Sequence, residues 1–359
     1  MKTKDEIQDL ALAAIGNKDR CSVGISMGVG KTLIGLKHMA KNYTDCSKFL
    51  VVAPKRSIFQ SWKDDAVKFG MSYLLESITF TTYISIQKQS LDYDVVYLDE
   101  CHSLLPTHEP WLSAYKGKIL GLTGTPPKYS NSEKGQMMDE FCPIVYKYVV
   151  DSAVDDKILN DYRIMLHPVY LDTGKSLKVE KNGKVWFTSE EANYDYWTNR
   201  LENARSQKEQ HIVRIMRMKA LMSFPSKEKY ALGLFRQITD KCILFANTHE
   251  QADKLCSHSY HSSNPKSEDN LLMFKEGKIN KLSAVLQLNE GVNIPELKEG
   301  IILHAYGNER KSSQRIGRML RLNPDDQAIV HILYYKDTID EIWVRKAIED
   351  FDSDKIIWK

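Results

Sequence analysis

The 359-residue chain has no cysteine pair of the C-x-x-C kind, and its six cysteines are scattered along the sequence. This usage fits reduced thiols, so we expect a cytoplasmic protein, in the host cytoplasm if the gene is viral. The chain also has no apolar run of membrane-spanning length, and the N-terminal MKTKDEIQDLALAAI lacks the core and cleavage site of a signal peptide. We therefore expect no membrane partner.

The chain also has no large excess of positive or negative charge. The chain has 50 Lys and Arg against 47 Asp and Glu, which gives a formal net charge of +3. Such a balance permits a polyanionic partner, but any nucleic-acid surface must be a local patch. Hydrophobic residues make up 42% and charged residues 27%, without a low-complexity tract, as in folded globular proteins. The length allows two domains of ordinary size.

Short apolar runs alternate with amphipathic segments in both halves of the chain. The strands expected from these runs are 22–27, 49–53, 78–83, 95–98 and 118–122, then 241–246, 282–288, 300–306 and 328–335. Strands that alternate with helices at this spacing predict parallel sheets covered by helices. The predicted fold class is α/β, with two blocks in series, residues 1–148 and 149–359.

Residues 164–238 have a different pattern and are predicted to be an insertion in the second block. Residues 164–188 suggest strands joined by turns, with Asn182-Gly183 as a hairpin signal, and residues 190–238 suggest helix. Two interpretations of the basic part, 200–229, stay open: an additional duplex-binding surface, or a solvated helix that packs on the second domain through Ile212, Ile215 and Met218. Its basic residues are Arg200, Arg205, Lys208, Arg214, Arg217, Lys219, Lys227 and Lys229.

The stretch SMGVGKTLIGL, which begins at Ser26, has the features of a phosphate-binding loop. Glycines let successive backbone N–H groups surround a polyphosphate, a lysine reaches the outer phosphates, and a hydroxyl binds magnesium. The apolar residues that follow are spaced like one face of a helix, whose N-terminus adds partial positive charge. One departure is Ile25, where the full pattern G-x-x-x-x-G-K-[ST] has glycine, so an ordinary loop-to-helix turn is the alternative. The predicted ATP-binding residues are Gly28, Val29, Gly30, Lys31 and Thr32.

The segment DVVYLDECHSLL provides the carboxylates that ATP hydrolysis needs. Asp99 and Glu100 fall where the apolar strand 95–98 ends. Ligands of open α/β sheets bind outside the carboxyl ends of the strands, so these residues are expected beside the loop at Lys31. Asp99 would hold Mg²⁺ together with Thr32, and Glu100 would polarise the attacking water. A strand that merely ends in polar residues is the alternative.

Segments in a fixed order resemble the motifs of the superfamily 2 helicases and translocases. LDECH resembles the D-E-x-H box, and LTGTPP, FANTHEQADKL, LNEGVNIP and QRIGRMLR resemble the motifs that follow it. The resemblance implies two tandem RecA-like domains with ATP in a cleft between them. SMGVGKT and SWK (61–63) are similar to the Swi/Snf translocases, which do not keep a glycine at the Ile25 position. The segment FCPIVYKYVVDSAVDDKILNDY resembles the branch of UvsW, XPB and the type III restriction motors, which we favour.

The resemblance also implies roles at the nucleotide. Arg318 and Arg321 would be arginine fingers that reach the γ-phosphate. A guanidinium suits this role because it is always charged and binds two phosphate oxygens at once. Gln314 would contact the nucleotide side or His102. Gln8 would read adenine, although the aromatic residue that usually precedes it is absent. Further implied contacts are Gly291 and Asn293 with the nucleotide, Asn293 standing where many members carry Asp, and His102, Thr123 and Thr125 in coupling the two sites.

Nucleic-acid contacts are implied at strand ends of both domains. Hydroxyl, amide and cationic groups suit phosphate contacts that ignore base sequence. Opening and closing of the cleft would move the two sets of contacts relative to one another. The expected function is an ATP- and Mg²⁺-dependent DNA helicase or translocase, with DNA preferred to RNA as partner. An RNA helicase, or a nucleotide-gated clamp that separates no strands, remains the alternative. The implied contacts are Pro54, Lys55, Arg56, Thr82, Tyr83, Asn247 and Thr248.

Overall fold

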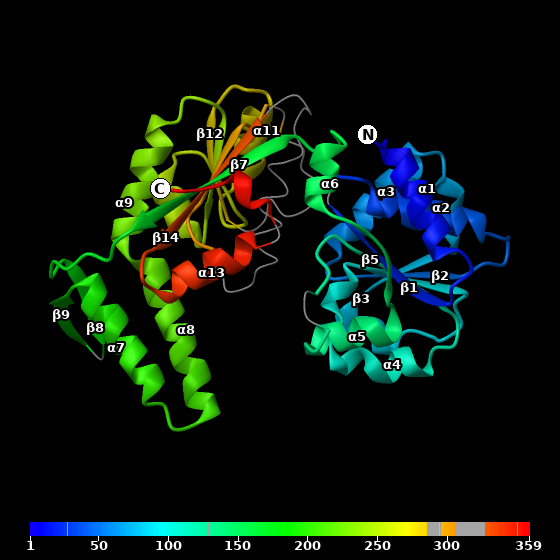
Figure 1. The fold of residues 1–359 in the computed structure, drawn as a ribbon, viewed down its shortest axis with the longest axis horizontal. Coiled ribbons are helices and arrows are strands. Elements are labelled where there is room, and N and C mark those ends of the chain that lie inside the picture. The colour runs from blue at the N-terminus through cyan, green and yellow to red at the C-terminus, as the bar shows by residue number, and fades with distance from the viewer. Residues whose placement is uncertain are drawn as a thin grey trace. The chain divides into compact units, whose positions relative to one another are not determined.

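A computed structural model describes residues 1–26, 28–127, 130–181, 183–285, 294, 296–305, 327–349 and 351–359. The chain divides into two compact units, Met1–Leu159 and Asn160–Lys359 (Figure 1). The first unit extends past the expected boundary near residue 148 because α6 (Val150–Asp155) follows directly on β6 (Ile144–Tyr148). The Tyr148 hydroxyl donates to the Asp156 carboxylate at 2.9 Å and so fixes α6 to this sheet.

A parallel sheet forms the centre of the first unit. Its order, for the described residues, is β3-β2-β4-β5-β1-β6. The five strands expected in the first half are confirmed, with ends that differ by a residue or two. Because the paired strands are parallel, the chain must cross over the sheet between them, usually as a helix, and these connections cover its faces. The bounds are β1 (Arg20–Ile25), β2 (Phe49–Ala53), β3 (Ile78–Thr82), β4 (Val95–Asp99), β5 (Lys118–Thr123) and β6 (Ile144–Tyr148).

Helices pack on both faces of this sheet (Figure 1). One face carries Trp62 of α3, whose ring lies 6.3 Å from the ring of Tyr97 on β4. The other carries a buried cluster in which Trp111 and Phe141 join Leu50 and Leu98 of the strands. β2 and β4 are buried along their whole length, as strands covered on both faces should be. The helices are α1 (Lys4–Ile15), α2 (Lys31–Lys41), α3 (Ser57–Lys68), α4 (Glu109–Ala114), α5 (Glu133–Phe141) and α6.

The second unit is also built on a parallel sheet, with the order β11-β12-β10-β13-β14-β7-β15 among the described residues. The expected strands of the second half are present, so the predicted α/β class of two RecA-like domains is confirmed. The strands are β7 (Asp161–Val169), β10 (Cys242–Ala246), β11 (Ser259–Tyr260), β12 (Lys281–Val285), β13 (Glu299–Ile302), β14 (Gln327–Tyr335) and β15 (Ile356–Trp358). The helices around them are α9 (Pro225–Gln237), α10 (His249–Leu255), α11 (Ser267–Lys275) and α13 (Ile339–Ile348).

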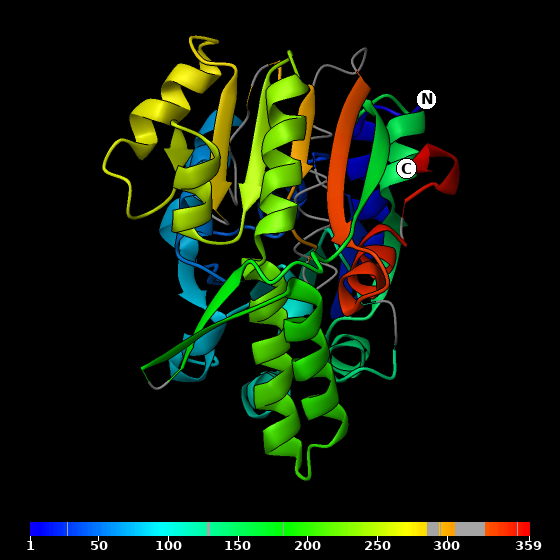
Figure 2. The same ribbon diagram turned by 90° about the vertical axis from the view of Figure 1, so that its left-hand side faces the viewer.

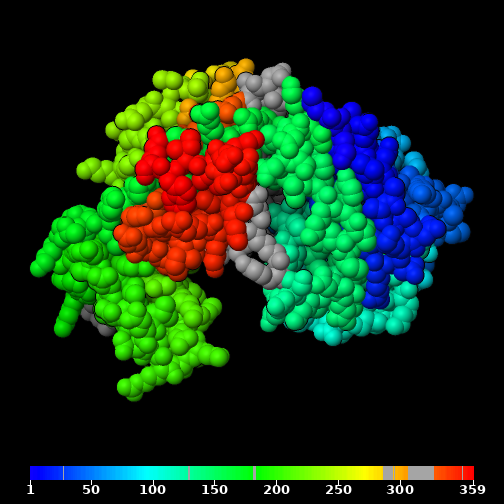
Figure 3. Space-filling model, viewed as in Figure 1, coloured from blue at the N-terminus to red at the C-terminus, as the bar shows by residue number. Residues whose placement is uncertain are grey.

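Residues 170–223, which we call the arm, project from the second unit (Figures 2 and 3). The arm consists of the hairpin β8 (Leu177–Lys181) and β9 (Lys184–Thr188), followed by α7 (Glu190–Glu202) and α8 (Gln207–Ser223). Gly183 at the turn has φ +74°, a left-handed conformation that favours glycine, in agreement with the hairpin signal. The arm is shorter than the expected insertion, because β7 and α9 belong to the layers of the sheet.

The interior of the arm lies between α7 and α8. On α8 the buried residues are Val213 and Leu221, whereas Ile212 is exposed. The packing interpretation included Ile212 among the contacts with the second domain, and that contact is wrong. The buried face of α8 meets α7, and near the end of the helix Leu221 also joins Val169 and Tyr335 of the second sheet. The basic residues of this region are exposed except for Arg217, which is half-buried, and Lys227, which is wholly buried.

Candidate nucleotide site

The loop between β1 and α2 has the conformation that its glycines allow. Gly28 has φ +91° and Gly30 has φ +95°, values that residues with a side chain rarely adopt. Gly30 directly precedes α2, which begins at Lys31, so the free N–H groups at the helix start point toward the loop. The structure thus places the five predicted ATP-binding residues in a strand–loop–helix arrangement that can bind an anion.

Gln8 supports this loop from α1. Its Nε2 donates to the Val29 carbonyl oxygen at 2.8 Å, and a Cβ at position 30 would lie only 3.0 Å from that nitrogen. The Gln8 side chain is almost completely buried, and its Oε1 has no hydrogen-bond partner among the described residues. A buried acceptor without a donor is costly unless a ligand supplies one.

Glu100 brings the acidic segment to the loop. It follows β4 in a left-handed conformation, φ +49°, which is unusual for a residue with a side chain. Its Oε1 lies 3.7 Å from the Lys31 Nζ, and its Oε2 accepts from the Gly124 N–H at 3.4 Å. Burial alone would raise the pKa of Glu100, but the positive charge of Lys31 and the nearby His102 outweigh it and hold the pKa below its usual value. The carboxylate is therefore ionised at neutral pH.

Asp99, at the end of β4, is held on two sides by aromatic residues. The Trp62 indole N–H donates to Asp99 Oδ2 at 2.8 Å, and the Tyr83 hydroxyl donates to the Asp99 carbonyl oxygen at 2.9 Å. Burial and the adjacent Glu100 charge raise the pKa of Asp99 to about 6, although the Trp62 hydrogen bond opposes the rise. An added cation would favour the ionised form.

His102 joins the acidic segment to the loop after β5. Its Nδ1 lies 2.7 Å from Thr123 Oγ1 and 3.3 Å from Glu100 Oε2. Thr125 is next in this group, with its hydroxyl 3.4 Å from the same nitrogen. The structure therefore brings together the three residues predicted to couple the two sites, and it connects them to Glu100.

The predicted nucleic-acid contacts of the first unit do not all face solvent. Lys55 and Arg56 are exposed just after β2, while Pro54 and Thr82 are half-buried. Tyr83 is only 5% exposed and its hydroxyl is engaged with Asp99, so a phosphate contact through Tyr83 does not fit the structure. The neighbouring Ile84 is 90% exposed instead, because a 3₁₀ helix has three residues per turn: Tyr83 and Ile86 share its buried side and Ile84 faces outward.

In the second unit, Asn247 and Thr248 follow β10, at the carboxyl edge of the sheet. Thr248 caps α10, because its hydroxyl accepts from the Gln251 N–H at 3.2 Å. Both polar atoms of the Asn247 amide are buried and have no hydrogen-bond partner among the residues that the structure describes. The remaining predicted residues of this unit, Gly291, Asn293, Gln314, Arg318 and Arg321, lie outside the described residues.

Two supporting residues were not expected from the sequence. Trp62 reaches Asp99 from α3, and a tryptophan on the apolar face of a helix is ordinarily a core residue. The Tyr83 hydroxyl supports the same aspartate by donating to its backbone carbonyl oxygen, a role different from the nucleic-acid contact predicted for Tyr83. The only signal for Trp62 in the sequence was the similarity of SWK to the Swi/Snf translocases, and that similarity did not indicate what Trp62 does.

A metal site built from protein side chains alone is not found in the described part of the chain. Across these residues no group of three His, Cys, Asp or Glu side chains is placed to hold a metal ion. A Mg²⁺ site of one carboxylate, one hydroxyl and phosphate oxygens would not need such a group. No described helix combines the length and the apolar character required to span a membrane.

Two family matches cover much of the chain. Residues 2–128 match the family "Type III restriction enzyme, res subunit", and residues 226–323 match "Helicase conserved C-terminal domain". The DNA 3'-5' translocase XPB2 of Sulfurisphaera tokodaii is 24% identical over 372 residues, covering 93% of this chain and 82% of that protein.

Solved structures of helicases and restriction motors share the fold. The Hef helicase domain of Pyrococcus furiosus aligns with a TM-score of 0.54 at 16% identity, covering 94% of this chain and 96% of that one. The ATP-dependent Type ISP restriction-modification enzyme LlaBIII, bound to DNA, aligns with a TM-score of 0.61 at 16% identity, covering all of this chain and 31% of that one. Two families thus match in series on two RecA-like units, and the chain is similar to superfamily 2 helicases of the XPB and restriction-enzyme type.

Proposed function

We propose that this protein is an ATP-dependent DNA helicase or translocase that couples ATP hydrolysis to movement along DNA. The observation that carries the proposal is the connected set Lys31, Glu100, His102 and Thr123. It joins a phosphate-binding lysine to a carboxylate and then, through a histidine, to a second loop. A simple ATP-binding site has no need for the last connection.

The residues present fit ATP and Mg²⁺. The loop at Gly28 and Gly30 has the conformation needed to surround phosphates, and Gln8 Oε1 is a buried acceptor suited to the amino group of adenine. Thr32 and Asp99 would hold the cation, Asp99 through water. When bound, ATP with Mg²⁺ supplies the phosphoanhydride bond and the charge that favours ionised Asp99.

Glu100 is the group that would handle the attacking water. Its lowered pKa keeps it ionised, so it can orient the water and take its proton. Lys31, which balances the Glu100 charge here, would move to the outer phosphates, and His102 would then be the remaining partner of Glu100. Arg318 and Arg321 stay predicted as the fingers that stabilise the developing charge.

Nucleic-acid binding is supported by exposed cationic groups in each unit. Lys55 and Arg56 follow β2 in the first unit. In the arm, α8 exposes Lys208, Arg214 and Lys219, and α7 adds Arg200. The arm also exposes Trp186 and Phe187 on β9, aromatic groups on which bases could stack. The exposed cations favour the duplex-binding interpretation of the basic region over a merely solvated helix, and the aromatic groups would suit unpaired bases. We propose DNA as the partner because XPB2 is named a DNA translocase and LlaBIII was solved bound to DNA.

The ATPase rate of the purified protein tests the proposal, measured alone and with single-stranded, duplex and forked DNA and with RNA. We expect strong stimulation by one form of DNA, lost in Lys31→Ala. A matched control is Lys41→Ala, an exposed lysine at the other end of the same helix, which should behave like the wild type.

Each alternative has its own result. Stimulation by RNA alone would identify an RNA helicase. Stimulation by DNA without strand displacement or translocation would identify a nucleotide-gated clamp. A rate that ignores every nucleic acid would refute the motor and leave the ATPase fold unaffected.

A further inference from the structure

Lys227 is a charged residue enclosed in the second unit, with no exposed surface. Its Nζ forms an ion pair with Asp340 and lies 3.0 Å from the Nδ1 of His304. The ammonium also sits 4.3 Å from the centre of the Tyr335 ring. A lysine is almost never fully buried unless it is paired, and these contacts supply its partners.

The neighbouring residue Ser226 lies at the root of the arm, by which we mean the two places where the chain enters and leaves residues 170–223. Glu190, at the start of α7, accepts from the Asp172 N–H at 3.0 Å and from the Ser226 N–H at 2.9 Å. Asp172 lies where the chain enters the arm, and Ser226 lies where it returns. Glu190 therefore clamps both ends of the arm together, directly beside Lys227.

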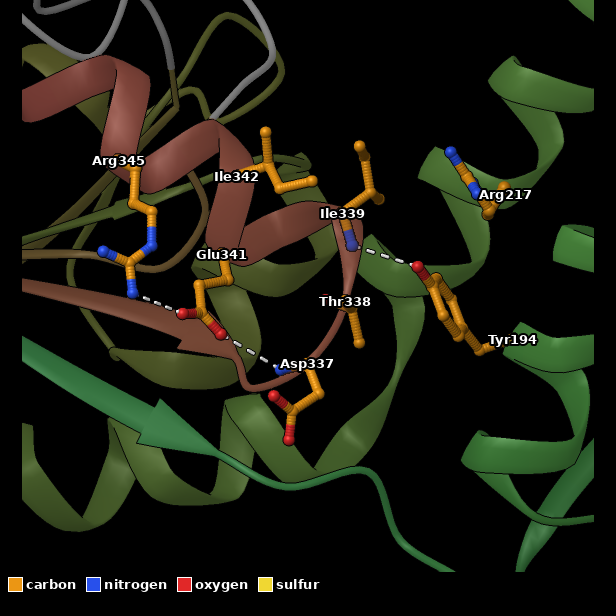
Figure 4. Close-up of a pocket in the computed structure, with 8 residues that line it drawn as sticks. All are labelled: Tyr194, Arg217, Asp337, Thr338, Ile339, Glu341, Ile342 and Arg345. Atoms are coloured by element: carbon orange, nitrogen blue, oxygen red, sulfur yellow. Dashed lines mark hydrogen bonds and ion pairs between the residues drawn. The ribbon is translucent and has the colours of Figure 1, made fainter.

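The start of α13 is the second contact of the arm root (Figure 4). The Ile339 N–H donates to the Tyr194 hydroxyl of α7 at 3.0 Å, and the next residue, Asp340, holds Lys227. Beyond this contact, an open pocket of about 390 Å³ separates Arg217 of α8 from α13. The arm is thus fixed at its root and has space beside it further out.

His304 extends these contacts to the predicted nucleotide side of the unit. It follows β13, which ends at Ile302, and Tyr335 ends the adjacent parallel strand β14. Both therefore lie at the carboxyl edge of the sheet, where α/β folds bind ligands. From His304 the chain continues into residues 306–326, which contain the predicted Gln314, Arg318 and Arg321.

We propose that Lys227 is a positioning residue of the motor, which links the root of the arm to His304 at the carboxyl edge of the second sheet. This inference rests on the proposed function. Nucleic acid bound to the arm would then change the rate of ATP hydrolysis through Lys227. Lys227 would not touch the nucleotide itself.

A purely structural role makes a different prediction. A buried ion pair contributes little net stability when both partners are replaced by neutral groups of similar size. The double variant Lys227→Met with Asp340→Asn removes both charges, and the new amide oxygen can still accept from the Tyr335 N–H, as Asp340 does at 2.9 Å. The matched control is Lys254→Met with Glu228→Gln, which removes an ion pair of the same unit between α9 and α10.

The experiment compares thermal unfolding, basal ATPase and nucleic-acid-stimulated ATPase, together with the affinity for the stimulating DNA. For the Lys227/Asp340 variant we expect wild-type unfolding, basal rate and affinity, but stimulation reduced roughly tenfold, the size of an ordinary coupling between two sites. The control pair should leave stimulation unchanged. Normal stimulation in the folded Lys227/Asp340 variant would overturn the proposal.

A second variant decides the question if the double variant does not fold. His304→Ala keeps the Lys227–Asp340 pair and removes the contact between Lys227 and His304, so it should lower stimulation as well. Unchanged stimulation refutes the link. If the wild-type ATPase itself ignores nucleic acid, the proposed function fails, and that result appears before any variant is made.

Discussion

Replacing Asp99 by asparagine should stabilise the ligand-free protein while it abolishes ATPase activity. Asp99 is buried, and its carboxylate is destabilised by that burial and by the adjacent charge of Glu100. An asparagine amide at this position carries no charge, and its oxygen can still accept from the Trp62 indole N–H. The substitution therefore removes the unfavourable charge with little change in shape.

The size of the effect follows from the pKa of Asp99. A rise from 3.8 to about 6 on folding corresponds to roughly 3 kcal/mol of destabilisation once the group is ionised in both states. Between these two pH values the folded protein binds more protons than the unfolded chain, so wild-type stability falls as the pH rises. Relative to the wild type, Asp99→Asn gains nothing below pH 4 and the full amount above pH 6.

Scanning calorimetry of the ligand-free protein from pH 4 to pH 8 measures this. For a unit of the size of Met1–Leu159, the gain should raise its Tm by roughly 6–12 °C at pH 7.5. Asp139→Asn, the same change at an exposed position of α5, should have little effect. Equal Tm values for Asp99→Asn and wild type at pH 7.5, or a gain that persists at pH 4, would refute the reasoning.

Three further predictions concern the loop, the aspartate and the arm. Trp62→Phe removes the hydrogen bond that lowers the pKa of Asp99. In a plot of kcat/KM for ATP against pH, the loss of activity on the acid side should therefore move up by roughly one pH unit. Trp111→Phe, which loses a comparable hydrogen bond to the Gln89 carbonyl oxygen, should leave this part of the profile unchanged. Gly30→Ala should weaken ATP binding at least about tenfold in a titration, because φ is +95° and the new Cβ meets Gln8. Gly70→Ala, with φ +71° and no described atom within 4 Å of the Cβ, should cost roughly 1–2 kcal/mol of stability and leave binding normal; equal binding by both variants would contradict the role given to Gln8. Replacing Lys208 and Arg214 of α8 by glutamate should weaken DNA binding and make the dependence of log K on log salt less steep, and an unchanged slope would exclude the arm from the contact.

The sequence predicted the sheets and the nucleotide loop because their signals are local. Apolar runs of strand length indicated the core strands, and glycines next to Lys31 indicated the loop. Asp99 and Glu100 were identified because the end of a parallel strand is a fixed place in an α/β sheet. These features need few distant contacts to be recognised.

The support around the site could not be predicted in the same way. Trp62 and Tyr83 contact Asp99 from other elements, and their sequence patterns are those of ordinary core residues. Lys227 was counted among surface cations, because its partners Asp340 and His304 are distant in the sequence. The contact given to Ile212 on α8 was wrong for a similar reason: periodicity shows that a helix has a buried face, but not which elements cover it.

The pairing of β7 has a consequence for how the protein is made. β7 opens the second unit, yet its neighbours in the sheet are β14 and β15, the last strands of the chain. Asp161 pairs with Gln327, so a ribosome that adds about 5–20 residues per second needs roughly ten to thirty seconds to deliver that partner. During this time the first unit and the arm can form from local contacts. Ile164 and Leu166 of β7, which are buried in the folded protein, still lack the neighbouring strand β14. The growing chain therefore keeps an apolar strand without its partner until synthesis is nearly complete. The yield of folded protein should depend on how well β7 is shielded from other apolar surfaces until β14 has been synthesised.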